Sequence, residues 1–140
     1  HTAGAAVIAG LARKLIAPPL KKVAFTLYGS FAKTYHGHGT DRALLGGMLG
    51  FSTDDLRIRD SFQIAKERGL DFTFLPNETE TDVHPNTVDI RMENDAGQVM
   101  EVRGVSLGGG KVKIVHINGV EVDFTGENSA LIVVQWDTPG

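Results

Sequence analysis

The chain contains no cysteine, and this absence excludes several kinds of chemistry within it. Disulfide bonds, thiolate nucleophiles and cysteine-ligated metal centres all need cysteine side chains. Any centre of these kinds must therefore lie outside these 140 residues. The lack of cysteine also fits a cytoplasmic location.

Long apolar runs and basic clusters are missing as well. No apolar run approaches the ~20 residues that a membrane-spanning helix needs. No run of Lys or Arg is longer than the pair Lys21-Lys22, and the formal net charge is −3. Nucleic-acid-binding domains normally carry a basic patch, so we expect neither a membrane nor a nucleic acid as a partner.

The residues that are present have the composition of one ordinary globular domain. Hydrophobic residues make up 41% and charged residues 22% of the chain, which is long enough to bury a sizeable core. The sequence opens at His1 without Met and stops at Gly140 after an apolar stretch. We therefore expect it to be a fragment of a longer protein.

Hydrophobic periodicity predicts an α+β fold. Helical spacing is found over residues 5–15, 41–50 and 60–68, whereas alternation over residues 21–28, 71–75, 88–92, 98–106, 111–117 and 120–124 predicts strands. Asn118-Gly119 is a strong hairpin signal. We expect a mixed or antiparallel sheet with helices packed on one side. Gly46-Gly47, inside a helix, predicts close packing against another backbone.

The stretch Tyr28–Asp41 joins a predicted strand to a predicted helix and is the strongest candidate site. Its glycines allow a ligand to approach the backbone, and the helix N-terminus offers unpaired N–H groups. Several of its residues can donate to a carboxylate or phosphate. The candidate anion- or substrate-binding residues are Ser30, Lys33, His36, His38, Gly39 and Thr40.

Other interpretations of these residues stay open at this point. The stretch can be a tight turn with polar decoration. His36 and His38 are spaced for a metal, but a third ligand is not evident. His1 lies just ahead of the first helix, where a histidine is usually an exposed end residue. No Ser-His-Asp spacing or HExxH motif is present.

Several motifs taken together resemble one enzyme family. These are His1-Thr2-Ala3-Gly4, Leu27–Ala32, Gly37–Asp41, Leu45–Phe51, His84-Pro85-Asn86-Thr87 and Ser106–Gly110. They closely resemble the beta subunit of bacterial iron–sulfur-dependent L-serine dehydratase. The resemblance implies an L-serine ammonia-lyase that forms pyruvate and ammonia. It implies a 4Fe-4S cluster held by a cysteine-bearing alpha subunit or domain and not by this chain.

The same resemblance implies roles for particular segments. His1 would be the catalytic base or a substrate-site residue. The body is also similar to the allosteric anion-binding domain of some D-3-phosphoglycerate dehydrogenases, where the stretch corresponding to Lys33–Thr40 holds an effector anion. The apolar segment 131–140 resembles the first strand of an ACT domain. We therefore expect a serine dehydratase beta-type domain over residues 1–127, and a linker with the start of a truncated ACT domain over residues 128–140.

Three functions follow as hypotheses. The chain contributes substrate or anion contacts to a cluster-bearing alpha subunit, with L-serine or another small anion as ligand, in a homo- or hetero-oligomer. Alternatively, it is a non-catalytic allosteric anion-binding regulatory domain of a serine-metabolism enzyme. As a third hypothesis it is a scaffold, for which apolar residues such as Leu44 matter and the polar ones do not.

Overall fold

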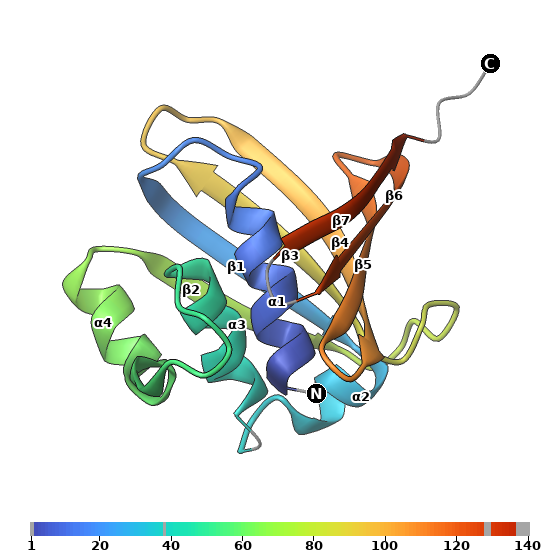
Figure 1. The fold of residues 1–140 in the computed structure, drawn as a ribbon. Coiled ribbons are helices and arrows are strands. Elements are labelled where there is room, and N and C mark those ends of the chain that lie inside the picture. The colour runs from blue at the N-terminus through green and yellow to red at the C-terminus, as the bar shows by residue number, and fades with distance from the viewer. Residues whose placement is uncertain (1, 38, 128–129, 137–140) are drawn as a thin grey trace.

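The computed structural model describes residues 2–37, 39–127 and 130–136 and has one seven-stranded sheet as its centre (Figure 1). The strands lie in the order β2-β1-β3-β4-β5-β6-β7. β1 and β2 are parallel, whereas each of the other neighbouring pairs is antiparallel, so the sheet is mixed. The strand bounds are β1 Leu20–Tyr28, β2 Asp71–Asn77, β3 Thr87–Asn94, β4 Val99–Gly108, β5 Lys111–Ile117, β6 Val120–Glu127 and β7 Ala130–Trp136.

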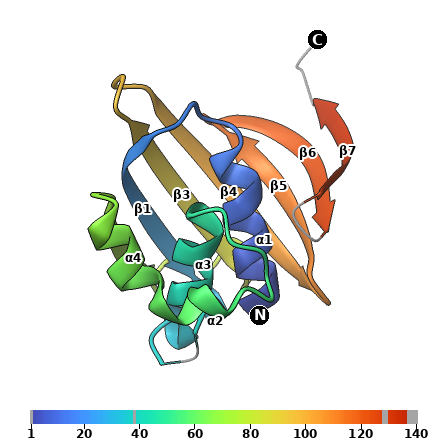
Figure 2. The ribbon, with the colours of Figure 1, turned by 60° about the vertical axis from the view of Figure 1, so that its left-hand side comes forward.

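The helices cover one face of this sheet, as Figure 2 shows. Their bounds are α1 Thr2–Arg13, α2 Gly29–Thr34, α3 Thr40–Met48, the 3-10 helix η1 Leu56–Asp60, and α4 Ser61–Glu67. The predicted α+β fold, with a mixed sheet and helices on one side, is therefore confirmed. Among the described residues, no helix combines the length and the apolar character needed to cross a bilayer.

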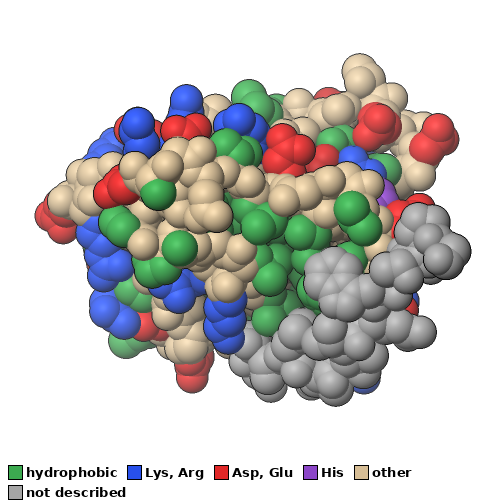
Figure 3. All heavy atoms as spheres, turned by 90° about the horizontal axis from the view of Figure 1, so that it is seen from above, with side chains coloured by type: hydrophobic (Ala, Val, Ile, Leu, Met, Phe, Trp, Pro, Cys, Tyr) green, Lys and Arg blue, Asp and Glu red, His purple; other side chains and the backbone are tan. Residues whose placement is uncertain are grey.

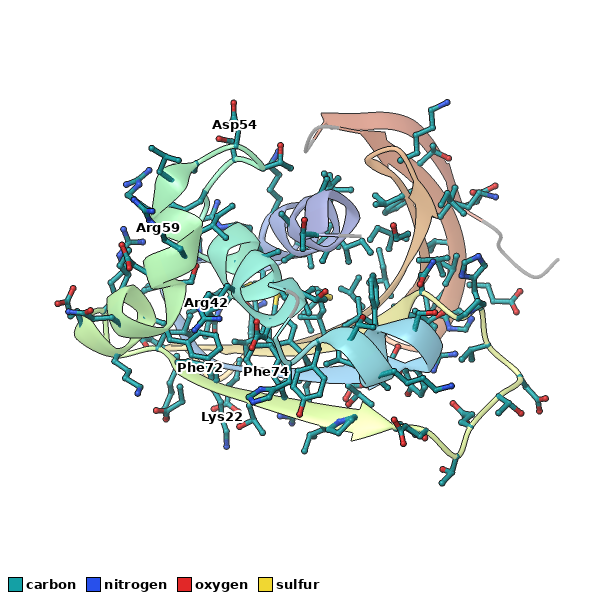
Figure 4. The ribbon with its side chains drawn as sticks, turned by 90° about the horizontal axis from the view of Figure 1, so that it is seen from below. Lys22, Arg42, Asp54, Arg59, Phe72 and Phe74 are labelled. Carbon is teal, nitrogen blue, oxygen red and sulfur yellow. The ribbon has the colours of Figure 1, made fainter. Side chains whose placement is uncertain are left out.

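Strand alternation explains which side chains enter the core. Val23, Phe25 and Leu27 are at most 1% exposed, and their neighbours on β1 point to the opposite face. Figure 4 shows Phe72 and Phe74 pointing from β2 toward the helical layer, with Lys22 on the other side. The Phe25 and Phe74 rings stack with centroids 5.0 Å apart, which extends the core across the parallel pair.

Close contact between α1 and α3 depends on a glycine. A Cβ placed on Gly47 would overlap the carbonyl oxygen of Ala6 and lie 2.9 Å from the Cβ of Ala9. The predicted close approach of Gly46-Gly47 to another backbone is thus confirmed for Gly47. Gly46 instead faces side chains, with its added Cβ 2.9 Å from the Cγ1 of Ile58.

Gly29–Thr34, expected as part of a loop, forms the helix α2, because the backbone turns at Gly29 directly from β1 into helical geometry. β7 pairs with β6 at the edge of the same sheet. The division into a domain over residues 1–127 and the start of an ACT domain over residues 128–140 stays a prediction.

Candidate functional site

Segments far apart in the sequence meet at one end of the molecule. The backbone N–H of Ser30 donates to the carbonyl of Pro85 at 2.7 Å, and the N–H of Ser106 donates to the carbonyl of Asn86 at 2.9 Å. A Cβ on Gly4 of α1 would lie 2.9 Å from the Cβ of Ser106. These contacts join the start of α1, the start of α2, the turn before β3 and the end of β4 into one surface, which we call the N-terminal face.

Gly29 makes this convergence possible. Its φ is +52°, a left-handed conformation that favours glycine. An added Cβ would lie 2.5 Å from the carbonyl oxygen of Pro85. Only a residue without a side chain therefore lets β1 turn into α2 while the backbone at Pro85 lies against it.

Helices α1 and α3 begin side by side at the N-terminal face. Gly39, the residue that precedes α3, is in the left-handed region at φ +82°, and a Cβ there would lie 3.6 Å from the Cγ2 of Thr2. At the other end of the pair, the Nε of Arg13 donates to the carbonyl of Met48 at 3.2 Å. The two helices therefore run in the same direction, and the positive ends of both dipoles lie together. The buried carboxylate of Asp41 already lies in the first turn of α3 and accepts from the N–H of Arg42 at 2.7 Å, so a further anion at the N-terminal face would depend mainly on the start of α1.

The described members of the predicted anion set lie on or beside this face but differ in exposure. Lys33, in the last turn of α2, and His36, just after it, are exposed. Ser30 and Gly39 are partly exposed, whereas Thr40 is 1% exposed at the start of α3. No hydrogen bond joins these described members to one another. His1 and His38 lie outside the described residues.

Comparisons with known proteins now give the family. The family described as "Serine dehydratase beta chain" matches residues 1–117. The "L-serine dehydratase, beta chain" of Peptoniphilus asaccharolyticus is 47% identical over 133 residues, which cover 95% of this chain and 60% of that protein. The "Probable L-serine dehydratase, beta chain" of Bacillus subtilis (strain 168) is 44% identical over 140 residues, which cover all of this chain and 63% of that protein.

The chain belongs to the serine dehydratase beta chain family. It spans about 60% of the length of these relatives. Five of the six motifs that carried the resemblance in the sequence lie at or next to the N-terminal face, at Gly4, Ser30, Gly39, Asn86 and Ser106, whereas Leu45–Phe51 lies at the other end of α3. In this serine dehydratase beta chain, the fold therefore gathers the segments that sequence reasoning had only noted separately.

The residues of this beta chain do not fit an iron–sulfur cluster. Such clusters are held by cysteine thiolates, and the chain has none. Within the part of the chain that the structure describes, no group of three or more His, Asp or Glu side chains could hold a metal ion. A cluster used by a serine dehydratase would need ligands from another chain or another domain.

A polar cluster on the sheet face away from the helices was missed by sequence reasoning. The guanidinium of Arg103 on β4 donates to both carboxylate oxygens of Asp89 on β3, at 2.7 and 2.9 Å. The hydroxyl of Tyr28 donates to the same carboxylate at 2.7 Å, and the Arg103 guanidinium lies 5.3 Å from the Tyr28 ring centroid. The signal in the sequence was the opposite charge of Asp89 and Arg103 on strands joined by a hairpin, which the antiparallel register places opposite each other.

The surroundings of this cluster shift two pKa values. Burial raises the pKa of Tyr28 to about 12, and the hydrogen bond to the negative Asp89 acts in the same direction. The hydrogen bond to Asp89 raises the pKa of Arg103 above its already high value. Tyr28 is therefore a neutral hydrogen-bond donor at physiological pH. The Tyr28 hydroxyl and the Arg103 guanidinium both bind the Asp89 carboxylate. The cluster therefore connects the end of β1 to β3 and β4 through side-chain hydrogen bonds.

One buried polar atom at the N-terminal face has no partner among the described residues. It is the side-chain Oδ1 of Asn86. The backbone N–H of Asn86 is used, since it donates to the Nδ1 of His84 at 3.0 Å, and the hydroxyl of Thr87 donates to the carbonyl of His84 at 2.6 Å. A buried acceptor without a donor is costly. The N-terminal face thus offers an acceptor that a ligand or a partner chain could satisfy.

Proposed function

We propose that this chain is part of an L-serine ammonia-lyase, in which it presents its N-terminal face to a cluster-bearing alpha subunit or domain. The enzyme would convert L-serine to pyruvate and ammonia in the cytoplasm. The 4Fe-4S cluster would belong to the alpha partner, because this chain has no cysteine to hold it. The observation that carries the proposal is the gathering of five of the family's six motif segments on one face.

The chemistry of the N-terminal face supports binding of a small carboxylate. Two helix N-termini lie side by side there, with their positive dipole ends together. In α3 two of the first N–H groups are already in use, since Asp41 donates to the carbonyl of Tyr35 at 3.3 Å and Arg42 donates to the carboxylate of Asp41 at 2.7 Å. Lys33 adds an exposed positive charge nearby. L-Serine carries a carboxylate, and Asn86 Oδ1 is an acceptor suited to a donor such as an ammonium or hydroxyl group. These features would bind and orient a substrate, whereas the loss of its hydroxyl group is assigned to the partner.

His1 is proposed as the base or as a substrate-site residue. The proposal rests on the family resemblance of His1-Thr2-Ala3-Gly4 and on the position of His1 next to Thr2, the first residue of α1. A neutral imidazole can accept a proton near pH 7, which suits removal of a proton from the α-carbon of serine.

The direct test measures pyruvate formation from L-serine with the full protein and its alpha partner. We expect no turnover from the beta chain alone and turnover when the partner is present. In the complex, His1→Ala should lower kcat by at least about a hundredfold, since a general base contributes that much or more. Lys22→Ala is the matched control, because Lys22 points away from the helical layer. Turnover by the beta chain alone, or unchanged turnover in His1→Ala, contradicts the proposal.

A second candidate function is allosteric anion binding, and the exposure of Lys33 and His36 favours it. An exposed lysine and histidine at a helix N-terminal face can bind an effector without taking part in turnover. In this case Lys33→Ala should weaken binding of phosphate or L-serine measured by calorimetry, and should leave the maximal rate of the complex unchanged. A fall in the maximal rate would instead place Lys33 with the substrate.

A further inference from the structure

A second hollow lies at the opposite end of α1 and α3 from the N-terminal face. It is a cavity of about 400 Å³ formed where α1 ends, where α3 ends and where α4 leads into β2. Because α1 has 12 residues, the two ends are about 18 Å apart along the helix. Figure 1 shows α1 running away from the labelled N-terminus toward this end. We call the hollow the C-terminal cavity; it is separate from the site of the proposed function.

The floor of the C-terminal cavity is apolar. It consists of Ile16, Met48, Leu49 and Leu70, which are 7%, 2%, 9% and 6% exposed. These side chains belong to the main hydrophobic core, so the floor is supported from behind. An apolar ligand group placed here would be removed from water, which is favourable in proportion to the apolar area buried.

The rim of the C-terminal cavity is cationic. Arg13, Lys14 and Arg68 line it, and none of the described residues that line it is acidic. Figure 3, which looks onto the molecule from above, shows Lys and Arg side chains beside hydrophobic ones on this face. A mixed rim and floor of this kind suits a ligand with a negative head and an apolar body.

The two arginines are held in place but are not neutralised. The Nε of Arg13 donates to the carbonyl of Met48 at 3.2 Å, and an Nη of Arg68 donates to the carbonyl of Leu49 at 3.4 Å. Each guanidinium has five N–H donors, so these bonds leave donors over. The ion pairs between described residues include neither Arg13 nor Arg68.

A purely structural role would account for part of this arrangement. Cations near helix C-termini stabilise the terminal carbonyls, and Arg13 and Arg68 both do so. That role does not require the cations to surround an apolar hollow. A structural role also does not explain why every charged residue among the described residues that line the cavity is positive.

We propose that the C-terminal cavity binds a small amphipathic monocarboxylate. The carboxylate accepts hydrogen bonds from the guanidinium groups of Arg13 and Arg68, and the hydrocarbon part lies on Ile16, Met48 and Leu70. A volume of about 400 Å³ is in the range of small-molecule sites in proteins. Recognition depends on both parts of the ligand: the charge fixes orientation, and the apolar body supplies desolvation.

Calorimetric titration of the full-length protein with three simple probes tests this. Hexanoate has both parts, inorganic phosphate has only the charge, and hexan-1-ol has only the apolar chain. We expect hexanoate to bind about tenfold more tightly than either of the other two. Equal affinity for phosphate, equal affinity for hexan-1-ol, or no binding of hexanoate overturns the proposal.

Substitutions locate the binding. Arg13→Gln and Arg68→Gln should each weaken hexanoate binding about tenfold, the effect of losing one charge-assisted hydrogen bond. Arg91→Gln is the matched control, because Arg91 lies on β3 and outside this cavity. If Arg13→Gln fails to fold, binding is measured with Arg68→Gln alone, because Arg68 is exposed and its substitution should not prevent folding. Unchanged affinity in a folded Arg68→Gln protein, or an equal loss in Arg91→Gln, contradicts the proposal.

Discussion

At the scale of single residues, Tyr28 is a buried, titratable member of the cluster that it forms with Asp89 and Arg103. Its side chain is only 5% exposed, and its hydroxyl donates to Asp89. The same Asp89 carboxylate binds Arg103 in a two-point contact. A phenol in this position stabilises the folded chain as long as it keeps its proton, because the ionised form would face a carboxylate at close range.

This predicts a pH-dependent stability that depends on Tyr28. The folded-state pKa is raised to about 12, above the ordinary value of about 10. The stabilisation is therefore fully present below about pH 10 and is lost as the pH rises toward 12. Chemical denaturation of the wild-type protein and of Tyr28→Phe should show a difference in unfolding free energy that narrows over this interval, at up to about 1.4 kcal/mol per pH unit.

The comparison with Tyr28→Phe removes the contribution of other groups that titrate at high pH, since both proteins share them. A difference that stays constant from pH 9 to pH 12 would show that Tyr28 does not titrate as described.

At the scale of secondary-structure elements, the packing of α1 against α3 determines the geometry of both the N-terminal face and the C-terminal cavity. The helices run in the same direction. Gly39 lies near Thr2 at one end, and the Met48 carbonyl accepts a hydrogen bond from Arg13 at the other. Gly47 lets them approach between those points. Changing the separation of the two helices would alter the N-terminal face and the C-terminal cavity together.

Gly47→Ala should therefore destabilise the protein, although alanine is the better helix former by about 1 kcal/mol. The added methyl meets the backbone of Ala6, which cannot move aside, and overpacking of this kind costs about 1–3 kcal/mol. Gly46→Ala is the matched control, because its methyl meets the side chains of Ile58 and Ser61, which can adjust. Urea denaturation should show a larger loss for Gly47→Ala, and a larger loss for Gly46→Ala would contradict this.

Sequence reasoning predicted the elements whose periodicity is strong. The alternation around Val23, Phe25 and Leu27 gave β1, and Asn118-Gly119 gave the β5–β6 hairpin, because these signals are local. It did not predict α2, where six residues follow a glycine with positive φ and have no long periodic pattern.

The candidate site was only partly readable from the sequence for a similar reason. Gly39 and Thr40 could be placed at a helix start from local signals. The approach of Pro85 to Gly29, and of Ser106 to Gly4, is a tertiary contact between distant segments, and a single sequence contains no local sign of it. The ion pair between Asp89 and Arg103 likewise depends on a tertiary feature, the register between β3 and β4.

At the scale of the whole molecule, the sheet separates two surfaces of different character. The helical side carries the N-terminal face and the C-terminal cavity at its two ends. The opposite side carries cross-strand ion pairs, Asp89 with Arg103 and the more exposed Arg91 with Glu101. The two ends of the helical side are thus separate surfaces that share the α1–α3 pair.

The parallel pairing of β1 with β2 has a consequence for the order of folding. The strands from β3 to β6 are joined by short turns and form neighbouring antiparallel pairs, which need little loop closure. β2 can pair with β1 only after residues 29–70 have folded back across the sheet, a contact between distant segments that forms slowly. The start of α2, one of the segments that form the N-terminal face, lies within that connection. We therefore expect the N-terminal face, the site of the proposed function, to be completed after the antiparallel sheet has formed.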